Sequence, residues 1–197
     1  MIAVRSLQKK IGQQEILRGV DLKINSGETL AIIGRSGGGK SVLLKHMVGL
    51  MEPDSGEIWI HGQNIIGMNE RQLGAIRKKV GILFQGGALS GGMKKRVGLA
   101  RAIIRRPSCV LYDEPTAGLD PVVADSINRL IRRLQQRFGM TSVVVTHDMK
   151  SAFDVADRIA YLHEGRIYFN GTASELQQSS DPLIQDFLLG RSDGGGD

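Results

Sequence analysis

The sequence predicts an α/β fold, with a mainly parallel sheet flanked by helices and an antiparallel β subdomain in the N-terminal third. Three early segments alternate as antiparallel strands do: 2–7, 16–24 and 57–60. Three later apolar runs have the length of strands: 29–33, 108–112 and 142–146. Each of these runs is followed by a helical pattern, which is typical of a parallel sheet covered on both faces. The length of 197 residues favours a single domain over 1–197.

The helices are predicted from apolar residues spaced three and four positions apart. The helix expected over 41–50 has one apolar face, made of Val42, Leu43, Met47 and Leu50. The helix expected over 121–138 carries a longer apolar stripe, made of Ile127, Leu130, Ile131, Leu134 and Phe138. Two shorter helices are expected over 94–105 and through Ala152 and Ala156.

The last third of the chain predicts a hairpin and then a helical extension. The hairpin covers 158–170 and turns at Glu164–Gly165. The extension covers 172–197, with a short helix after Thr172, a second helix over 182–189 and a flexible glycine-rich tail. Whether this extension is a segment that contacts a partner or an ordinary capping helix stays open.

The composition narrows the class of function. The net charge of +6 and the pI of 9.7 raise the possibility of nucleic-acid binding. Aromatic residues make up only 5 % of the chain, and most basic residues are spread along it, so we expect no nucleic-acid partner. The one cysteine, Cys109, predicts a buried apolar side chain and no intrachain disulfide. No targeting segment and no membrane span is expected.

A glycine-rich segment follows the first predicted parallel strand and opens a helix. It matches the phosphate-loop pattern G-x-x-x-x-G-K-[ST], and we name it the phosphate loop: Gly34, Arg35, Ser36, Gly37, Gly38, Gly39, Lys40 and Ser41. Glycines let successive backbone N–H groups converge on phosphate oxygens, and the helix dipole adds positive charge there. Lys40 is expected to bind the β- and γ-phosphates of ATP, and Ser41 to bind Mg²⁺. A plain glycine-rich turn is the alternative, which the strand–loop–helix context disfavours.

Two carboxylates end the apolar run that contains Cys109. Asp113 and Glu114 are adjacent, and adjacent strand residues point to opposite faces, so the two groups have different roles. We assign Asp113 to the Mg²⁺ shell, directly or through water, and Glu114 to the attacking water as general base. Such a pair is often only a solvated turn, but the phosphate loop upstream favours the functional interpretation.

The sequence Leu89-Ser90-Gly91-Gly92-Met93 precedes a basic helical stretch, and here the chain resembles the ABC ATPase family. It is similar to that family's signature LSGGQ, with Met93 at the position of the glutamine. Further family motifs appear in the expected order: Gln85 as the Q-loop glutamine, Ala117 to Asp120 as the D-loop, and His147 as the switch histidine. The resemblance covers nearly the whole chain and implies a P-loop NTPase fold.

The resemblance implies a homodimer in which each ATP lies between one phosphate loop and the other copy's signature. It implies that four residues act on ATP held by the other copy: Ser90, Gly91, Gly92 and Asp120. It also implies catalytic roles for Glu114, His147 and Gln85, with Gln85 reaching Mg²⁺ as well. Integral membrane permease subunits are the implied partners, and the implied location is cytoplasmic, on the inner face of the membrane.

Two departures from the family pattern stand out. The family stacks adenine on an aromatic side chain, and Ile11 occupies that approximate position here, which leaves base selectivity undetermined. The family also carries a helical subdomain between the Q-loop and the signature, whereas only residues 86–89 separate Gln85 from Ser90. We expect that this subdomain is missing between 85 and 90, through disorder or excision, or else that the chain is a natural minimal variant. A Cα–Cα step far above about 3.8 Å within residues 88–90 would decide between these.

Several segments resemble the Mla or Mce type of ABC ATPase, which energises lipid transport across the bacterial envelope: 86–89, 92–98, 181–187 and 190–191. Periplasmic or auxiliary lipid-binding subunits are then further implied partners. ATPases of amino-acid or metal importers are the alternative, and a soluble non-transport ABC ATPase is a more distant one. Cargo and direction of transport do not follow from the sequence.

Overall fold

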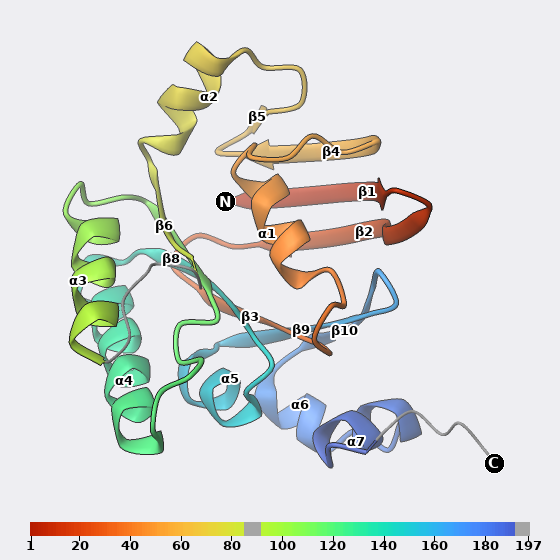
Figure 1. Cartoon of the computed structure of the whole chain (residues 1–197), viewed down its shortest axis with the longest axis vertical. Coiled ribbons are helices and arrows are strands. Elements are labelled where there is room, and N and C mark those ends of the chain that lie inside the picture. The colour runs from red at the N-terminus through yellow and green to blue at the C-terminus, as the bar shows by residue number, and fades with distance from the viewer. Residues whose placement is uncertain (85–91, 192–197) are drawn as a thin grey trace.

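The computed structural model describes residues 1–84 and 92–191, and at 92–95 the backbone alone. Its N-terminal sheet is antiparallel, in the order β2-β1-β4-β5 (Figure 1). The strands are β1 (Ile2–Ile11), β2 (Gln14–Ile24), β4 (Ser55–Ile60) and β5 (Gln63–Asn64). This confirms the predicted antiparallel subdomain, with longer strands and one short strand that the sequence did not indicate.

The second sheet has six strands in the order β10-β9-β3-β8-β7-β6. They are β3 (Thr29–Ile33), β6 (Val80–Leu83), β7 (Cys109–Asp113), β8 (Thr141–Thr146), β9 (Arg158–His163) and β10 (Arg166–Gly171). All neighbours are parallel except β9 and β10, which form the predicted hairpin. Glu164 and Gly165 both have positive φ in its turn, as a two-residue hairpin of matching twist requires.

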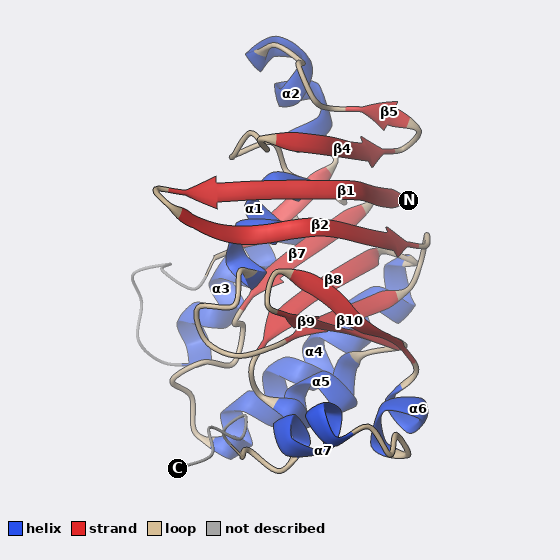
Figure 2. Cartoon of the chain, turned by 90° about the vertical axis from the view of Figure 1, so that its right-hand side faces the viewer, coloured by secondary structure: helices blue, strands red, loops and turns tan. Residues whose placement is uncertain are grey.

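Helices cover both faces of the six-stranded sheet. They are α1 (Lys40–Met47), α2 (Glu70–Arg77), α3 (Gly92–Ile103), α4 (Pro121–Phe138), α5 (Met149–Val155), α6 (Ala173–Gln177) and α7 (Pro182–Leu188). Figures 1 and 2 show α1 between the two sheets, with α4 to α7 beyond the opposite face of the parallel sheet. The molecule is therefore layered, and β3, β7 and β8 form its centre.

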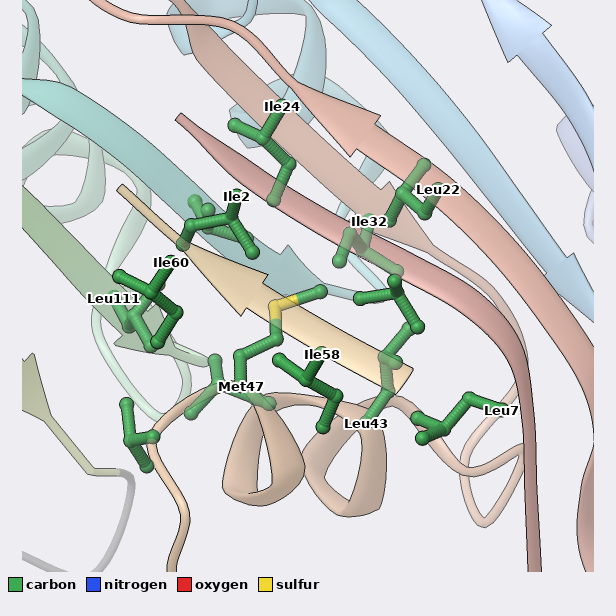
Figure 3. Close-up of a cluster of buried hydrophobic side chains, with 14 of the residues drawn as sticks. Ile2, Leu7, Leu22, Ile24, Ile32, Leu43, Met47, Ile58, Ile60 and Leu111 are labelled. Atoms are coloured by element: carbon green, nitrogen blue, oxygen red, sulfur yellow. The ribbon is translucent and has the colours of Figure 1, made fainter. Parts of the chain in front are cut away.

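Alternating side chains of the central strands enter different cores. Leu111 of β7 and Ile32 of β3 join the cluster between the sheets, where Figure 3 shows them with Met47 of α1 and Ile58 of β4. Their chain neighbours contact the other helices: Val110 and Tyr112 pack with α4, and Ala31 and Ile33 with α5 to α7. This two-sided burial explains why these strands are apolar throughout. Cys109 is buried as predicted, and burial raises the pKa of its thiol to about 12.

The long helix α4 has the predicted bounds and clear end signals. Asp120 is its N-cap, and its Oδ1 accepts hydrogen bonds from the backbone N–H groups of Val122 (3.1 Å) and Val123 (3.0 Å). Pro121 occupies the first turn, and Gly139 ends the helix in the left-handed conformation. The predicted stripe is only partly right, because Ile127 and Ile131 are buried whereas Phe138 is 48 % exposed.

Other boundaries differ from the prediction. Helix α1 ends at Met47 instead of residue 50, because Gly49 turns the chain and the Leu50 N–H bonds back to the Lys45 carbonyl (3.0 Å). Leu50 is consequently half-exposed. Helix α2, which the sequence did not predict, begins with a capping box between Asn69 and Gln72.

None of the helices in the described ranges is both long enough and apolar enough to cross a membrane.

The burial of α4 predicts the effect of shortening one side chain. Ile131 is fully buried against the sheet, so Ile131→Ala removes apolar contacts and leaves a cavity. We expect a loss of about 2–5 kcal/mol in the free energy of unfolding, measured by urea denaturation. The matched control is Arg133→Ala on the exposed face of the same helix, expected to change it by less than about 0.5 kcal/mol. Equal losses in the two variants would contradict this packing.

Candidate active site

Three parallel strands end side by side and bring distant segments together. Ile33 of β3 pairs with Thr146 of β8, and Asp113 of β7 pairs with Val145 of β8. The residues that follow the strands therefore lie at one edge of the sheet: the phosphate loop after β3, Glu114 after β7 and His147 after β8. Ligands of open α/β sheets bind at this carboxyl edge.

Glycine is required at particular points of the phosphate loop. A Cβ on Gly34 would lie 2.4 Å from the Leu162 carbonyl oxygen, so only glycine fits beside β9. Gly39 is the N-cap of α1 with φ of 92°, a conformation that glycine adopts without steric cost. The loop thus turns tightly, and the N-terminus of α1 lies at the carboxyl edge of the sheet. A helix N-terminus at this place favours the binding of an anion.

Lys40 is only 6 % exposed, and its ammonium is held by the loop itself. Its Nζ donates to the carbonyl oxygens of Gly34 (2.7 Å) and Arg35 (2.8 Å). Burial lowers the pKa of Lys40, while the nearby carboxylates of Glu114 and Asp113 act in the opposite direction. A partly desolvated cation beside the loop attracts an anionic ligand strongly, because the surroundings screen its charge weakly.

Ser41 and Asp113 form a pair of hard oxygen ligands. The Ser41 hydroxyl donates to Asp113 Oδ1 over 2.9 Å, which joins α1 to the end of β7. Burial raises the pKa of Asp113, the Ser41 hydrogen bond opposes this, and the charge of Glu114 adds to it. Mg²⁺ commonly takes one or two protein oxygens and completes its shell with water and substrate phosphates, so this pair fits the ion.

Glu114 lies beyond the strand and faces two groups from the end of β8. Its Oε1 is 2.9 Å from His147 Nδ1, and its Oε2 accepts a hydrogen bond from the Thr146 hydroxyl over 3.1 Å. An ionised carboxylate only accepts, so Nδ1 of His147 carries the hydrogen in this contact. The Glu114 side chain is 9 % exposed, whereas that of His147 is 55 % exposed. The His147 ring is therefore accessible to a bound ligand while its Nδ1 contacts the Glu114 carboxylate.

One pocket of about 270 Å³ is lined by part of the phosphate loop, by Val42 after it, and by Glu114 and His147; the loop residues are Ser36, Gly37, Gly39, Lys40 and Ser41. Among the other predicted site residues, Gly92 begins α3 and Asp120 is exposed at the start of α4. Ile11 is 48 % exposed at the end of β1, outside the lining of this pocket. Gln85, Ser90 and Gly91 lie outside the described residues, as does the step within 88–90 that would test the missing subdomain.

One contributor to the site was not predicted from the sequence. Thr146, the last residue of β8, gives its hydroxyl to Glu114. In the sequence, only the position of Thr146 next to His147 could have indicated this role. The contact with Glu114 itself requires that β7 and β8 are neighbours in the sheet, which the local sequence does not show.

A family model described as ABC transporter matches this chain over residues 17–88 and 85–117. The chain is 32 % identical to the Haemophilus influenzae intermembrane phospholipid transport system ATP-binding protein MlaF, over 98 % of this chain and 92 % of that protein. It is also 32 % identical to the methionine import ATP-binding protein MetN of Rhizobium etli, over 96 % of this chain and 66 % of that protein.

A solved structure has a similar fold. It is a dimeric ATP-binding cassette, MJ0796, in a post-hydrolysis state bound to ADP and Pi. The TM-score is 0.78 at 28 % sequence identity, over 87 % of this chain and 98 % of that one.

The raised pKa of Asp113 predicts how stability depends on its charge. The folded protein holds the Asp113 proton more tightly than the unfolded chain does, so stability falls as pH rises through this titration. At neutral pH the ionised group therefore destabilises the protein without nucleotide and metal. Asp113→Asn, which can still accept from Ser41, is expected to raise the thermal unfolding midpoint at pH 7, and by less as pH falls.

Thermal unfolding followed by circular dichroism measures this difference between variant and parent. Asp186→Asn serves as the surface control, because its ion pair with Arg191 is long (3.9 Å) and exposed. A lower midpoint for Asp113→Asn at pH 7 would contradict the electrostatic argument.

Proposed function

Since the chain belongs to the ABC transporter family and is an ABC-type ATPase, we propose that it powers phospholipid transport across the bacterial envelope as the ATP-hydrolysing subunit of a membrane transporter. The single observation that carries the chemistry is the shared edge of the sheet, where Lys40, Ser41, Asp113, Glu114 and His147 meet. Lys40, Ser41, Glu114 and His147 line one pocket, and Asp113 is joined to it through its hydrogen bond with Ser41, an arrangement that suits phosphoryl transfer.

In the proposed mechanism the phosphate loop binds the triphosphate of ATP. Its backbone N–H groups and the start of α1 contact the phosphate oxygens, and Lys40 exchanges the carbonyls of Gly34 and Arg35 for the β- and γ-phosphates. Ser41 and Asp113, which lie within 2.9 Å of each other, would hold Mg²⁺, and Gln85 would be a further ligand. Bound Mg²⁺ neutralises part of the phosphate charge.

Glu114 acts as general base on the attacking water, and His147 orients the γ-phosphate. The contact between His147 Nδ1 and Glu114 Oε1 (2.9 Å) supports these two roles, because it holds the histidine beside the base. Gln85 is assigned a catalytic role in the same step. In this mechanism catalysis consists of positioning and charge stabilisation.

A second copy of the chain completes each site. Ser90, Gly91 and Gly92 bind the γ-phosphate of the ATP held by the other copy, and Asp120 approaches the same site. The position of Gly92 at the start of α3 supports this, since a helix N-terminus attracts anions. The dimeric form of the similar cassette is consistent with it. Ile11 gives the adenine ring an apolar contact without a stacking face.

The lipid cargo is supported by the extent of the likeness. The chain spans 92 % of the phospholipid transport protein but 66 % of the methionine import protein, at the same identity. Membrane permease subunits and auxiliary lipid-binding subunits are the proposed partners, and the proposed location is the cytoplasmic face of the membrane. Amino-acid import is the second candidate, favoured by the methionine import relative.

We also propose that the helical subdomain of the family is missing from this chain between 85 and 90. The alignment with the Haemophilus protein runs over 243 positions although this chain has 197 residues. The family model matches in two segments that overlap at residues 85–88. Both facts support a loss at this point of the chain. The residues 172–197 remain a C-terminal extension.

The role of Glu114 gives a prediction for turnover. Glu114→Gln keeps the shape of the side chain but removes the basic oxygen, so we expect ATPase turnover to fall by about 10²–10⁴. ATP affinity, measured by calorimetry, should be unchanged. Lys40→Ala serves as the contrast, because it should lose ATP binding as well. Undiminished turnover in Glu114→Gln would remove Glu114 from the role of base.

The cargo is tested in the whole complex. We expect the tagged chain to co-purify with an integral membrane subunit, and phospholipid to be found by mass spectrometry of the purified complex. Methionine or a metal ion bound in place of lipid would end the phospholipid proposal while leaving the ATPase intact.

A further inference from the structure

Glu114 has an unusual backbone conformation. Its φ is 49°, in the left-handed region that residues with side chains rarely adopt. Its N–H donates to the Val145 carbonyl over 2.9 Å, which fixes the backbone to β8. Strained residues of this kind persist only where the surroundings hold them in place. The side-chain contacts around Glu114 show what holds its carboxylate.

The first of these contacts is the hydroxyl of Thr146. Thr146 is fully buried, and its Oγ1 donates to Glu114 Oε2 over 3.1 Å. The same oxygen accepts the backbone N–H of Asp148 over 3.0 Å. An N–H can only donate, so the hydroxyl oxygen accepts in this second bond and its own hydrogen is left for the carboxylate. The side chain that ends β8 therefore has both hydrogen-bonding roles filled.

A second hydroxyl, that of Ser151 on α5, continues the network. Ser151 is 1 % exposed and donates to Asp148 Oδ2 over 2.6 Å. It accepts from Asn128 Nδ2 over 3.0 Å, and its Oγ lies 3.2 Å from Thr116 Oγ1. Since the one proton of Ser151 goes to Asp148, Thr116 is the donor in the last contact.

These bonds form a closed circuit around the proposed base. It runs from Glu114 through Thr146, Asp148 and Ser151 to Thr116, which is two residues from Glu114 in the chain. The circuit joins the segment after β7 to the end of β8 and to α5 through side chains and the backbone N–H of Asp148, in addition to the ladder between the strands. Both ends of the Glu114 segment are thereby fixed.

We propose that Thr146 is a positioning residue for Glu114, and that Ser151 holds the other end of the same circuit. This inference rests on the proposed role of Glu114 as general base. Neither hydroxyl is assigned a contact with ATP, so their effect is on the orientation of the carboxylate. A misplaced base slows the chemical step and leaves binding of the nucleotide intact.

The test compares variants of the full chain in steady-state ATP hydrolysis. Thr146→Val preserves the shape and removes the hydroxyl, and we expect kcat to fall roughly 10- to 100-fold. KM for ATP should stay within about a factor of two. Thr146→Ser restores the hydroxyl and should restore most of kcat. Ser151→Ala should lower kcat in the same direction with KM again unchanged.

Thr141→Val is the matched control. Thr141 lies at the opposite end of β8, is also buried, and its hydroxyl accepts the Gly27 N–H over 2.9 Å. The substitution breaks a partly buried hydrogen bond at the other end of the same strand without touching the circuit. We expect it to lower stability while kcat stays near that of the parent. An equal loss of kcat in Thr141→Val and Thr146→Val would overturn the proposal.

The double variant separates this proposal from the proposed function. If Thr146 acts through Glu114, adding Thr146→Val to Glu114→Gln should cause no further loss of kcat. A further tenfold loss would overturn the positioning role. Full kcat in Thr146→Val, with the loss in Glu114→Gln intact, would overturn this inference alone. Full kcat in Glu114→Gln would overturn the assigned base itself, and the positioning role with it.

Discussion

The site depends on the register of three parallel strands. Ile33 lies opposite Thr146, and Asp113 lies opposite Val145, so three segments far apart in sequence reach the same edge together. A slip of one residue in any strand would turn its side chains to the other face, which two fully buried cores forbid. The packing that stabilises the sheet therefore also aligns the phosphate loop, Glu114 and His147. The relative positions of the site residues are therefore fixed by the burial of the strands that precede them.

The charged side chains at the carboxyl edge of the sheet destabilise the protein when no ligand is bound. Burial lowers the pKa of Lys40 and raises that of Asp113, so each charge is disfavoured where it stands. The loop carbonyls and the Ser41 hydroxyl compensate in part. A ligand carrying several negative charges and a divalent cation would replace these internal partners with stronger ones. Sites that sacrifice stability in this way are preorganised for charge, which is what phosphoryl transfer needs.

Sequence alone predicted the parts of the molecule that follow from local patterns. The bounds of β3 and α4, the hairpin at Glu164–Gly165 and the buried Cys109 all depend on short-range signals, and the structure has them as predicted. Phe138 continues the apolar period of α4 but is the last residue of the helix and is 48 % exposed. The periodicity predicts which face of a helix is apolar, but it does not predict how far along the helix other elements cover that face.

The candidate site divides in the same way. The phosphate loop and the acidic pair are contiguous in sequence, so their chemistry could be predicted, and the structure brings Ser41 within 2.9 Å of Asp113. The circuit through Thr146 and Ser151 could not be predicted, because each bond joins segments whose proximity exists only in the folded sheet. Asp120 shows a further limit: its carboxylate caps α4, a structural role that the sequence resemblance did not indicate.

Only four residues separate Gln85 from Ser90, and the elements on either side of this stretch pack against each other. β6 precedes it and α3 follows it, and the two pack directly: a Cβ on Gly81 would lie 2.4 Å from the Ala102 carbonyl oxygen. Leu83 and Leu99 are buried in one cluster with Tyr112 of the acidic strand. The contacts that support Asp113 and Glu114 thus come from elements present in this chain. The central strands thus position the phosphate loop, Asp113, Glu114 and His147, and this part of the site does not depend on the residues between β6 and α3.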